Sequence, residues 1–381
     1  MNINQPATES HYQITNETHE LFLDLVIFCS LIRKSPILAQ LKMSTSFANE
    51  QPEGFKNHVV NVAIVGASGR VGGHIAAALI EDKKHKVTAI TRPESTGKMP
   101  SGLHDTKKVD YNDHASLVKA LQGHDVLIIT MSVMAPKENT ANLINAAVEA
   151  GIRWIMPNEW GVDSPHTTAG KDTLLGDRML ATREHIVKAG AGKTQWIGLC
   201  CGFWYEFSLA GTEARFGFDF DQKTLTLYDD GNTKINTSTW PQVGRAVSKL
   251  LSLKILPDNK DETSPCLSQY TNKSAYISSF FISQRDMFDS VLRVTGDKEE
   301  DWKVTYEDVV ERFQRGQKLF FEEKKMVGFG ILLYARMFYN DGSSNFNDKL
   351  ANKLLGLPTE DLDEATKVGI KMWHAGERNM G

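Results

Sequence analysis

From residue 57 onward, short apolar runs alternate with stretches that are apolar on one face only. The runs are rich in β-branched residues, as buried strands are, and the stretches between them have the spacing of amphipathic helices. Strands are expected at residues 59–65, 86–92, 107–110, 125–131, 153–157 and 195–201, and helices just after residue 70 and at 113–121, 138–150 and 175–189. This alternation predicts an α/β fold, a doubly wound parallel sheet of the Rossmann type.

The turn after the first strand carries the clearest chemical signal. Residues 59–72 read V-V-N-V-A-I-V-G-A-S-G-R-V-G, with glycines at 66, 69 and 72. The first glycine allows a sharp turn, the second leaves room for a phosphate, and the third lets the helix pack close to the sheet. The pyrophosphate of a dinucleotide is then expected at the positive end of the helix. The predicted cofactor contacts in this loop are Gly66, Ser68, Gly69, Arg70, Val71 and Gly72.

The end of the second strand indicates which dinucleotide fits. NAD enzymes usually place Asp or Glu there, where the carboxylate binds the ribose 2′-hydroxyl. This chain has Arg92, with Arg70 as a second positive charge and Glu94 close by. Because a guanidinium binds a 2′-phosphate well, NADP(H) is the expected cofactor. The alternative is that both arginines are solvated surface groups.

The second half of the chain has a more irregular pattern. Strand-like pieces are expected at 224–228 and 275–283, and helices at 243–252, 285–294 and 307–315. We expect an NAD(P)-binding Rossmann domain at 57–202 and a smaller substrate-binding part at 203–381, interleaved with the sheet. Residues 1–56 are expected to be an extension that is dispensable or disordered. Their apolar stretch at 21–32 is shorter than the ~20 residues of a bilayer span.

Charge and cysteine content narrow the function further. The chain has 381 residues and a formal net charge of −4, so it lacks the basic footprint of a nucleic-acid-binding protein. Its four cysteines show no metal-binding spacing, and no metal site is expected. We expect no direct nucleic-acid or membrane partner. The expected compartment is the cytoplasm, with the nucleus as an alternative.

The usual acid–base pair of short-chain dehydrogenases is absent. That pair is Tyr-x-x-x-Lys, in which the lysine lowers the pKa of a tyrosine that donates a proton. None of the nine tyrosines is followed by Lys four residues later. Any proton transfer must therefore use another group.

Several longer strings carry a family resemblance. They are G-A-S-G-R-V-G at 66–72, I-T-R at 90–92, M-P-N-E-W-G-V-D at 156–163 and C-G-F-W-Y-E-F-S-L at 201–209. Together they resemble the NmrA-like and isoflavone-reductase-like family of atypical short-chain dehydrogenases, over about residues 59–253. The resemblance implies a Rossmann core that binds NADP(H) and a small C-terminal part that closes over a hydrophobic substrate.

In the reductases of this family, a lysine soon after the P-x-E-[FW]-G string takes part in proton transfer. Here Arg178 or Met179 lies near that position, and Lys171 is several residues early. Arginine stays protonated and cannot exchange a proton usefully. Lys171 is therefore the candidate acid–base residue, and an ordinary exposed loop lysine is the alternative.

The remaining candidates follow the predicted strands, where ligands of doubly wound sheets bind. Further cofactor contacts are expected from Ser132, Pro157 and Asn158, and substrate contacts from Glu159, Phe203, Trp204 and Tyr205. Alternatively, Glu159 caps a turn by accepting backbone hydrogen bonds, and the three aromatic residues belong to a packed core cluster.

Two functions fit these residues. The first is an NADP(H)-dependent reductase of a small, aromatic or conjugated substrate. The second is a redox-sensing regulator that binds NAD(P) without turnover and contacts another protein. NADPH consumption separates the two.

Overall fold

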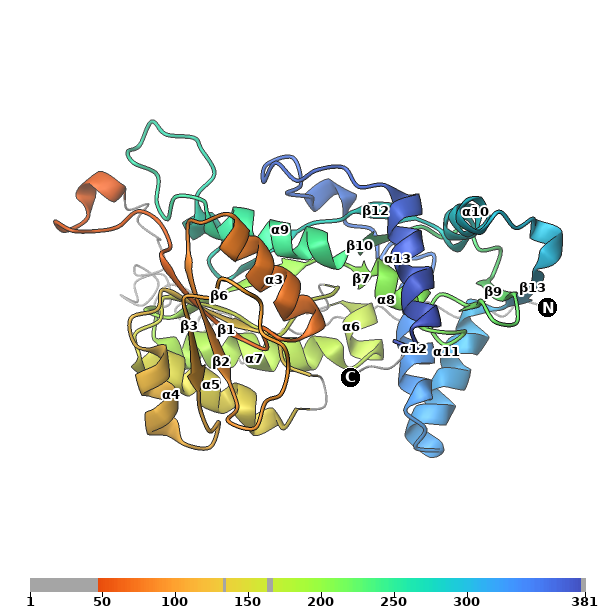
Figure 1. Cartoon of the computed structure of the whole chain (residues 1–381), viewed down its shortest axis with the longest axis horizontal. Helices are drawn as coiled ribbons and strands as arrows, with labels where there is room; N and C mark the ends of the chain where they lie inside the picture. Colours follow the sequence, from red (N-terminus) through yellow and green to blue (C-terminus); the bar gives the residue numbers. More distant parts are fainter. Residues whose placement is uncertain (1–46, 133–134, 163–166, 378–381) are drawn as a thin grey trace, which may run out of the picture.

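Seven parallel strands form the central sheet of the protein (Figure 1). The computed structural model describes residues 47–132, 135–162 and 167–377. In spatial order the strands are β11 (Lys273–Tyr276), β6 (Gln195–Cys200), β5 (Trp154–Met156), β4 (Val126–Ile129), β1 (Asn61–Val65), β2 (Lys86–Thr91) and β3 (Asp105–Lys108). Every neighbouring pair in this order is parallel. The predicted Rossmann-type sheet is confirmed.

Side-chain alternation along the strands produces two apolar cores. Val62 and Ile64 of β1 belong to one core, and Ala63 and Val65 to the other, as expected when successive side chains point to opposite faces. Helices from both halves of the chain contribute to these cores. Helices α3 (Arg70–Glu81) and α9 (Trp240–Leu251) pack together in the first core, and α4 (His114–Leu121), α5 (Lys137–Glu149) and α7 (Leu175–Gly190) contribute to the second.

The second half of the chain builds two small sheets and a group of helices. One sheet has the order β12 (Phe280–Ile282), β10 (Ile235–Ser238) and β7 (Phe203–Trp204), and the other β13 (Lys303–Glu307), β9 (Thr224–Tyr228) and β8 (Phe218–Asp219). The helices are α8 (Tyr205–Leu209), α10 (Gln284–Thr295), α11 (Val309–Gln317), α12 (Val327–Met337) and α13 (Leu362–His374). Of the helices in the described ranges, none has the length and apolar character that a membrane crossing requires.

The predicted strand at 275–283 is wrong, because two strands in different sheets occupy it. The chain leaves the main sheet after β11, and the Ser278 hydroxyl donates hydrogen bonds to Thr237 O at 3.2 Å and Phe280 O at 2.7 Å. These bonds turn the backbone toward the smaller sheet that contains β12. Since β11 lies at the edge of the main sheet, the second half is interleaved with the first.

The beginning of the described chain is attached to the body. The backbone N–H of Ala48 donates to Pro257 O at 2.9 Å, and that of Asn49 donates to Asp258 O at 3.2 Å. Residues 47–56 therefore differ from the expected disordered extension. Residues 1–46 lie outside the described residues, and their dispensability stays a prediction.

A buried polar cluster lies at the start of α9. Glu360 accepts hydrogen bonds from the Thr239 hydroxyl at 2.8 Å and from Arg245 at 2.5 Å, and it also accepts one from Ser279. Glu206 of α8 is buried nearby, and its Oε2 has no hydrogen-bond partner. Burial, with a smaller effect of the Glu360 charge, raises the pKa of Glu206 to about 8.

This raised pKa predicts how stability depends on pH. The folded protein keeps the Glu206 proton that the unfolded chain releases above its ordinary pKa of 4.5, so stability should fall as pH rises from about 4.5 through 8. Glu206→Gln should remove this loss and exceed the wild type by on the order of 3 kcal/mol at about pH 8, with little difference near pH 5. Chemical denaturation at several pH values measures the effect. Glu184→Gln, an exposed site on α7, is the matched control, and equal pH dependence of all three proteins would contradict the prediction.

Candidate cofactor and substrate site

The glycine loop joins β1 to α3 at the carboxyl edge of the sheet. Gly66 has a φ of +83°, and a Cβ there would lie 2.6 Å from the Thr130 hydroxyl and even closer to the Thr130 carbonyl. A Cβ on Gly72 would overlap the Gly66 carbonyl and the same hydroxyl. The Thr130 hydroxyl itself donates to Val65 O at 2.7 Å. Both glycines are therefore required by the close packing of β1, the end of β4 and α3.

Gly69 differs from these two glycines. It precedes the first residue of α3, has an extended backbone, and a Cβ there would have only the Gly66 carbonyl near it, at 3.1 Å. The protein itself hardly requires glycine at this position. Ser68 and Gly69 are both exposed at the start of the helix, where N–H groups lack partners within the helix. The missing side chain leaves a cradle for an anionic group, and this fits the predicted pyrophosphate.

A hollow of about 380 Å³ lies beside this loop, beyond β2 and β3. It is lined by Arg92, Pro93, Glu94, Val109, Asp110, Tyr111, Asn112, Pro136 and Asn139. The Arg92 side chain is 61% exposed and lies 3.3 Å from the Glu94 carboxylate, an ion pair that contributes little in solvent. Burial raises the pKa of Tyr111 to about 12, so its hydroxyl stays neutral. The lining of the hollow is mixed: it contains one cation, Arg92, the carboxylates of Glu94 and Asp110, and apolar groups such as Val109 and Pro136.

The loop after β2 brings this hollow and the glycine loop together. A Cβ on Gly97 would lie 2.7 Å from the Ser68 Cβ. The residues that follow Arg92 therefore pass directly over the glycine loop. The glycine loop and the loop after β2, which the sequence pointed to separately, therefore lie in contact.

Arg70 does not join Arg92 as the sequence suggested. Its guanidinium lies 5.3 Å from the centre of the Phe207 ring and 5.9 Å from that of Trp240, and it does not line the hollow beside Arg92. Arg215 stacks on the same Phe207 ring at 3.7 Å. Phe207 and Trp240 thus lie beside the Arg70 side chain. The predicted contact of Arg70 with the cofactor stays a prediction.

Ser132, Pro157 and Asn158 follow β4 and β5 at the same edge as the glycine loop. Asn158 donates to Met131 O at 2.9 Å and so fixes the two loops to each other. Pro157 is buried and Ser132 is exposed. Their predicted contacts with the cofactor stay predictions.

Glu159 is part of a buried ion pair. Its carboxylate lies 2.7 Å from the Arg183 guanidinium, which also donates to Ser274 at 3.3 Å and stacks on Trp196 at 4.2 Å. The carboxylate thus ties its loop to α7 and β11. Sequence reasoning missed Arg183, which carries no motif of its own. The described contacts of Glu159 are structural, and its contact with substrate stays a prediction.

The three consecutive aromatic candidates have different surroundings. Phe203 stacks on Tyr334 at 4.0 Å, and Trp204 lies 5.9 Å from Trp240. Tyr205 is fully buried, and its hydroxyl bonds Thr366 at 2.6 Å. Burial raises the pKa of Tyr205 well above its ordinary value. The structure contradicts the expected place of Tyr205 in an open pocket, because α13 covers it.

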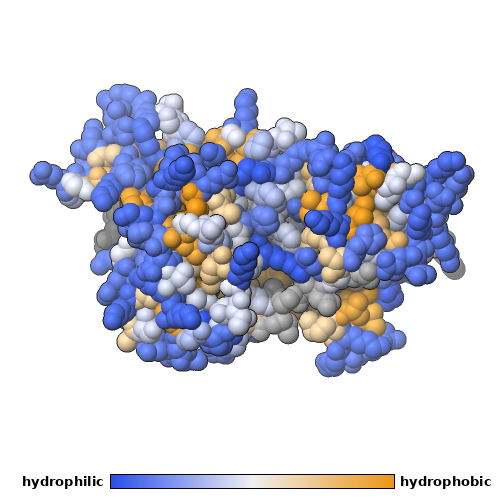
Figure 2. Space-filling model, viewed as in Figure 1, coloured by the Kyte–Doolittle hydropathy of each residue, from blue (hydrophilic) through white to orange (hydrophobic). Residues whose placement is uncertain are grey.

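Lys171 is exposed on the short helix α6 (Thr168–Asp172). The neighbouring Asp172 carboxylate forms an ion pair with Arg336 at 2.6 Å. Arg178 is exposed on α7. Figure 2 shows that the surface is hollowed near its centre, and Figure 1 places the beginning of α3 and α6 in that region. This location is compatible with a substrate that reaches the glycine loop from solvent. The part of Lys171 in proton transfer stays a prediction.

Comparison with known proteins agrees with this geometry. The model of the NmrA-like family matches residues 59–188. An oxidoreductase of Aspergillus flavus, aprR, is 27% identical over 317 residues, which is 82% of this chain and 99% of that protein. Pinoresinol reductase 2 of Arabidopsis thaliana is 26% identical over 194 residues, 46% of this chain and 59% of that protein. The chain is therefore similar to the NmrA-like family over residues 59–188.

Solved structures of reductases have the same fold as this chain. The structure of AtPrR2 with NADP+ and (+)pinoresinol has a TM-score of 0.61 and 19% identity, and the match covers 83% of this chain and all of that one. The range that the family model matches contains the strings at 66–72, 90–92 and 156–163, which carried the resemblance in the sequence. At this identity the likeness concerns the fold alone.

Two glycine substitutions separate folding from ligand binding. Gly72→Ala should destabilise the protein by about 2–4 kcal/mol, because the new methyl group overlaps the Gly66 carbonyl. Gly69→Ala should leave stability within about 1 kcal/mol and weaken NADP(H) binding at least tenfold. Denaturant unfolding and calorimetric titration measure these effects. Unchanged binding in folded Gly69→Ala would contradict the assignment of the cradle.

Proposed function

We propose that the protein is an NADP(H)-dependent oxidoreductase that acts on a small aromatic or conjugated substrate. The observation that carries the proposal is the cradle at Gly69 beside the hollow that Arg92 lines. The two lie at the carboxyl edge of a doubly wound sheet, where dinucleotides bind. The names of the relatives, an oxidoreductase and a reductase, support the same activity.

Each part of the surface suits one part of NADP(H). The start of α3 would hold the pyrophosphate, and the hollow that includes Tyr111 and Pro136 would take the adenosine. Arg92 would bind the 2′-phosphate and exchange its weak pairing with Glu94 for a charge-assisted contact. The bound coenzyme supplies a hydride donor or acceptor. The AtPrR2 structure with NADP+ supports this choice of coenzyme.

The aromatic cluster near Arg70 suits a flat apolar substrate. Trp204, Phe207 and Trp240 have ring centres 5.7–5.9 Å apart, and the Arg70 guanidinium lies over two of these rings. Aromatic walls exclude water from a hydride transfer. Because Arg70 is the first residue of α3, this cluster adjoins the proposed pyrophosphate site.

The charge of Arg92 should decide between the two coenzymes. Arg92→Glu should weaken NADPH binding at least a hundredfold, since repulsion replaces attraction, and change NADH binding less than threefold. Calorimetric titration of both coenzymes tests this. Lys119→Glu on α4 makes the same charge change at an exposed site outside the hollow and should leave both affinities unchanged. Equal loss of both coenzymes in Arg92→Glu would contradict the role of Arg92.

The exposed amine of Lys171 is the remaining candidate for proton transfer. Lys171→Ala should lower kcat at least a hundredfold, as loss of a general acid does, while NADPH affinity stays unchanged. The assay follows NADPH oxidation with enone and quinone substrates, and Lys188→Ala on the exposed face of α7 is the control. Full turnover in Lys171→Ala would remove this residue from the mechanism.

A sensing role without turnover is the second candidate. It is favoured by the exposure of Lys171, the candidate acid–base residue, and by the burial of the Tyr205 hydroxyl away from any open site. Tight NADP(H) binding without NADPH consumption across the substrate panel would support the sensor and contradict the enzyme. A protein partner would then be required to transmit the signal.

A further inference from the structure

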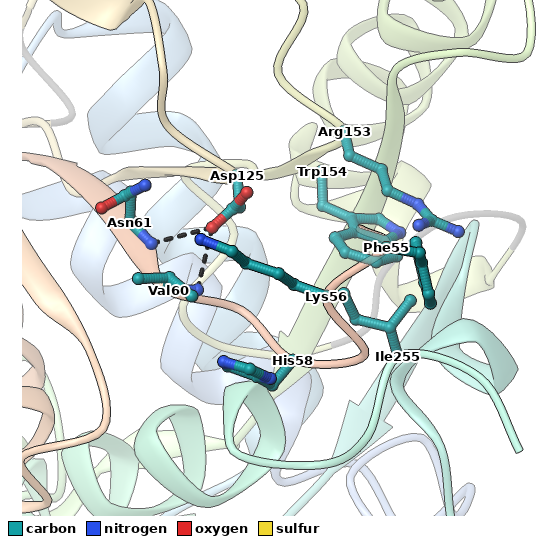
Figure 3. Close-up of a pocket in the computed structure, with 9 residues that line it drawn as sticks. All are labelled: Phe55, Lys56, His58, Val60, Asn61, Asp125, Arg153, Trp154 and Ile255. Atoms are coloured by element: carbon teal, nitrogen blue, oxygen red, sulfur yellow. Dashed lines mark hydrogen bonds between the residues drawn. The ribbon is translucent and has the colours of Figure 1, made fainter. Parts of the chain in front are cut away.

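A second hollow lies at the opposite edge of the central sheet. It has a volume of about 250 Å³ and is lined by Phe55, Lys56, His58, Val60, Asn61, Asp125, Arg153, Trp154 and Ile255 (Figure 3). Residues 61, 125–126 and 153–154 lie at the amino ends of β1, β4 and β5, so the hollow is separated from the glycine loop by the length of the strands. For the five residues of β1, this length is roughly 16 Å.

The walls of this hollow are held in place by the fold. Asn57 donates from Nδ2 to Leu256 O at 2.9 Å and accepts from Leu256 N at 2.8 Å. These two bonds fix the segment that carries Phe55, Lys56 and His58 against the loop that carries Ile255. These bonds preorganise the walls, so little conformational entropy would be lost on binding.

The single carboxylate in the hollow has a structural role. Asp125 Oδ2 accepts hydrogen bonds from the backbone N–H groups of Val60 and Asn61, both at 2.8 Å. These bonds fasten the beginning of β1 to the residue that precedes β4. Two dipoles directed at this oxygen offset part of its negative charge.

Unlike Asp125, the two permanent cations of the hollow, Arg153 and Lys56, have no hydrogen-bond partner within the described ranges. The Arg153 guanidinium carbon lies 4.4 Å from the centre of the Trp154 ring, a cation–π contact that uses none of the guanidinium N–H groups as hydrogen-bond donors. Lys56 extends toward Asp125 without forming an ion pair (Figure 3). Within the described ranges, neither side chain donates a hydrogen bond or forms a salt bridge. Two positive charges thus face one carboxylate.

From this arrangement, we propose that the amino-edge hollow binds a small organic monoanion with an apolar body, such as an aryl carboxylate. Arg153 and Lys56 would bind the carboxylate, and Phe55 and Ile255 would contact the ring. The volume equals that of about eight water molecules in the liquid, which limits the ligand to on the order of ten non-hydrogen atoms. A dinucleotide is far too large for it.

Benzoate is a suitable probe for the full-length protein, because its size and charge match the hollow. Calorimetry or saturation-transfer NMR should show one saturable site with a Kd of ~1 mM or tighter. Benzamide has the same shape without the charge and should bind at least tenfold more weakly. Inorganic phosphate lacks the apolar body and should also bind more weakly than benzoate.

Substitutions in the hollow test whether benzoate binds there rather than at the cofactor site. Arg153→Gln and Lys56→Gln should each weaken benzoate at least tenfold without changing NADP(H) affinity. Lys86→Gln, an exposed lysine at the amino end of β2 outside the hollow, should change neither. Thermal melting of each variant verifies that it is folded.

Saturating NADP+ should not displace benzoate if the two sites are distinct. The proposal is overturned if the full-length protein shows no saturable benzoate binding, as would occur if the chain's own amino-terminal residues filled the hollow. It is also overturned by equal binding of benzamide, by unchanged binding in both variants, or by displacement with NADP+. Absence of NADP(H) binding would contradict the proposed oxidoreductase function but would not affect the proposal of a benzoate site.

Discussion

The close contact between the glycine loop and the end of β4 is the constraint on which the rest of the structure depends. Gly66, Gly72 and Thr130 bring β1, β4 and α3 within a distance that no additional side-chain atom could occupy. This contact sets the direction of α3 and places its first turn at the carboxyl edge of the sheet. Gly69 then provides an opening that faces outward, so one short segment supplies both the packing and the anion cradle.

The second half of the chain depends on the same helix. On α9, Gly244 allows close approach to the α3 backbone, because a Cβ there would overlap the His74 carbonyl. The Glu360 cluster fixes the beginning of α9 to the segment before α13. Since Trp240 begins α9 and contacts Arg70, this packing also brings the aromatic cluster to the cofactor edge. Sheet, cradle and aromatic cluster therefore form one connected unit.

Much of the fold was readable from the sequence because its signals are local. Strand–helix alternation predicted the main sheet, and the glycine spacing with Arg92 indicated the cofactor edge. Short strands such as β7 and β8 were missed because two residues carry no clear periodicity. The surroundings of Arg70 could not be predicted because they include Phe207 and Trp240, which are distant in sequence. Likewise, the burial of Tyr205 depends on Phe280 and on Thr366 of α13, which are distant in sequence.

The most direct test of the account is hydrogen–deuterium exchange of the unmodified protein with and without NADP+. The account predicts slower exchange at Ser68–Val71 and around Arg92 and Tyr111, with no change at the amino ends of the strands. Unchanged exchange in the glycine loop at saturating NADP+, or protection confined to the opposite edge of the sheet, would contradict it.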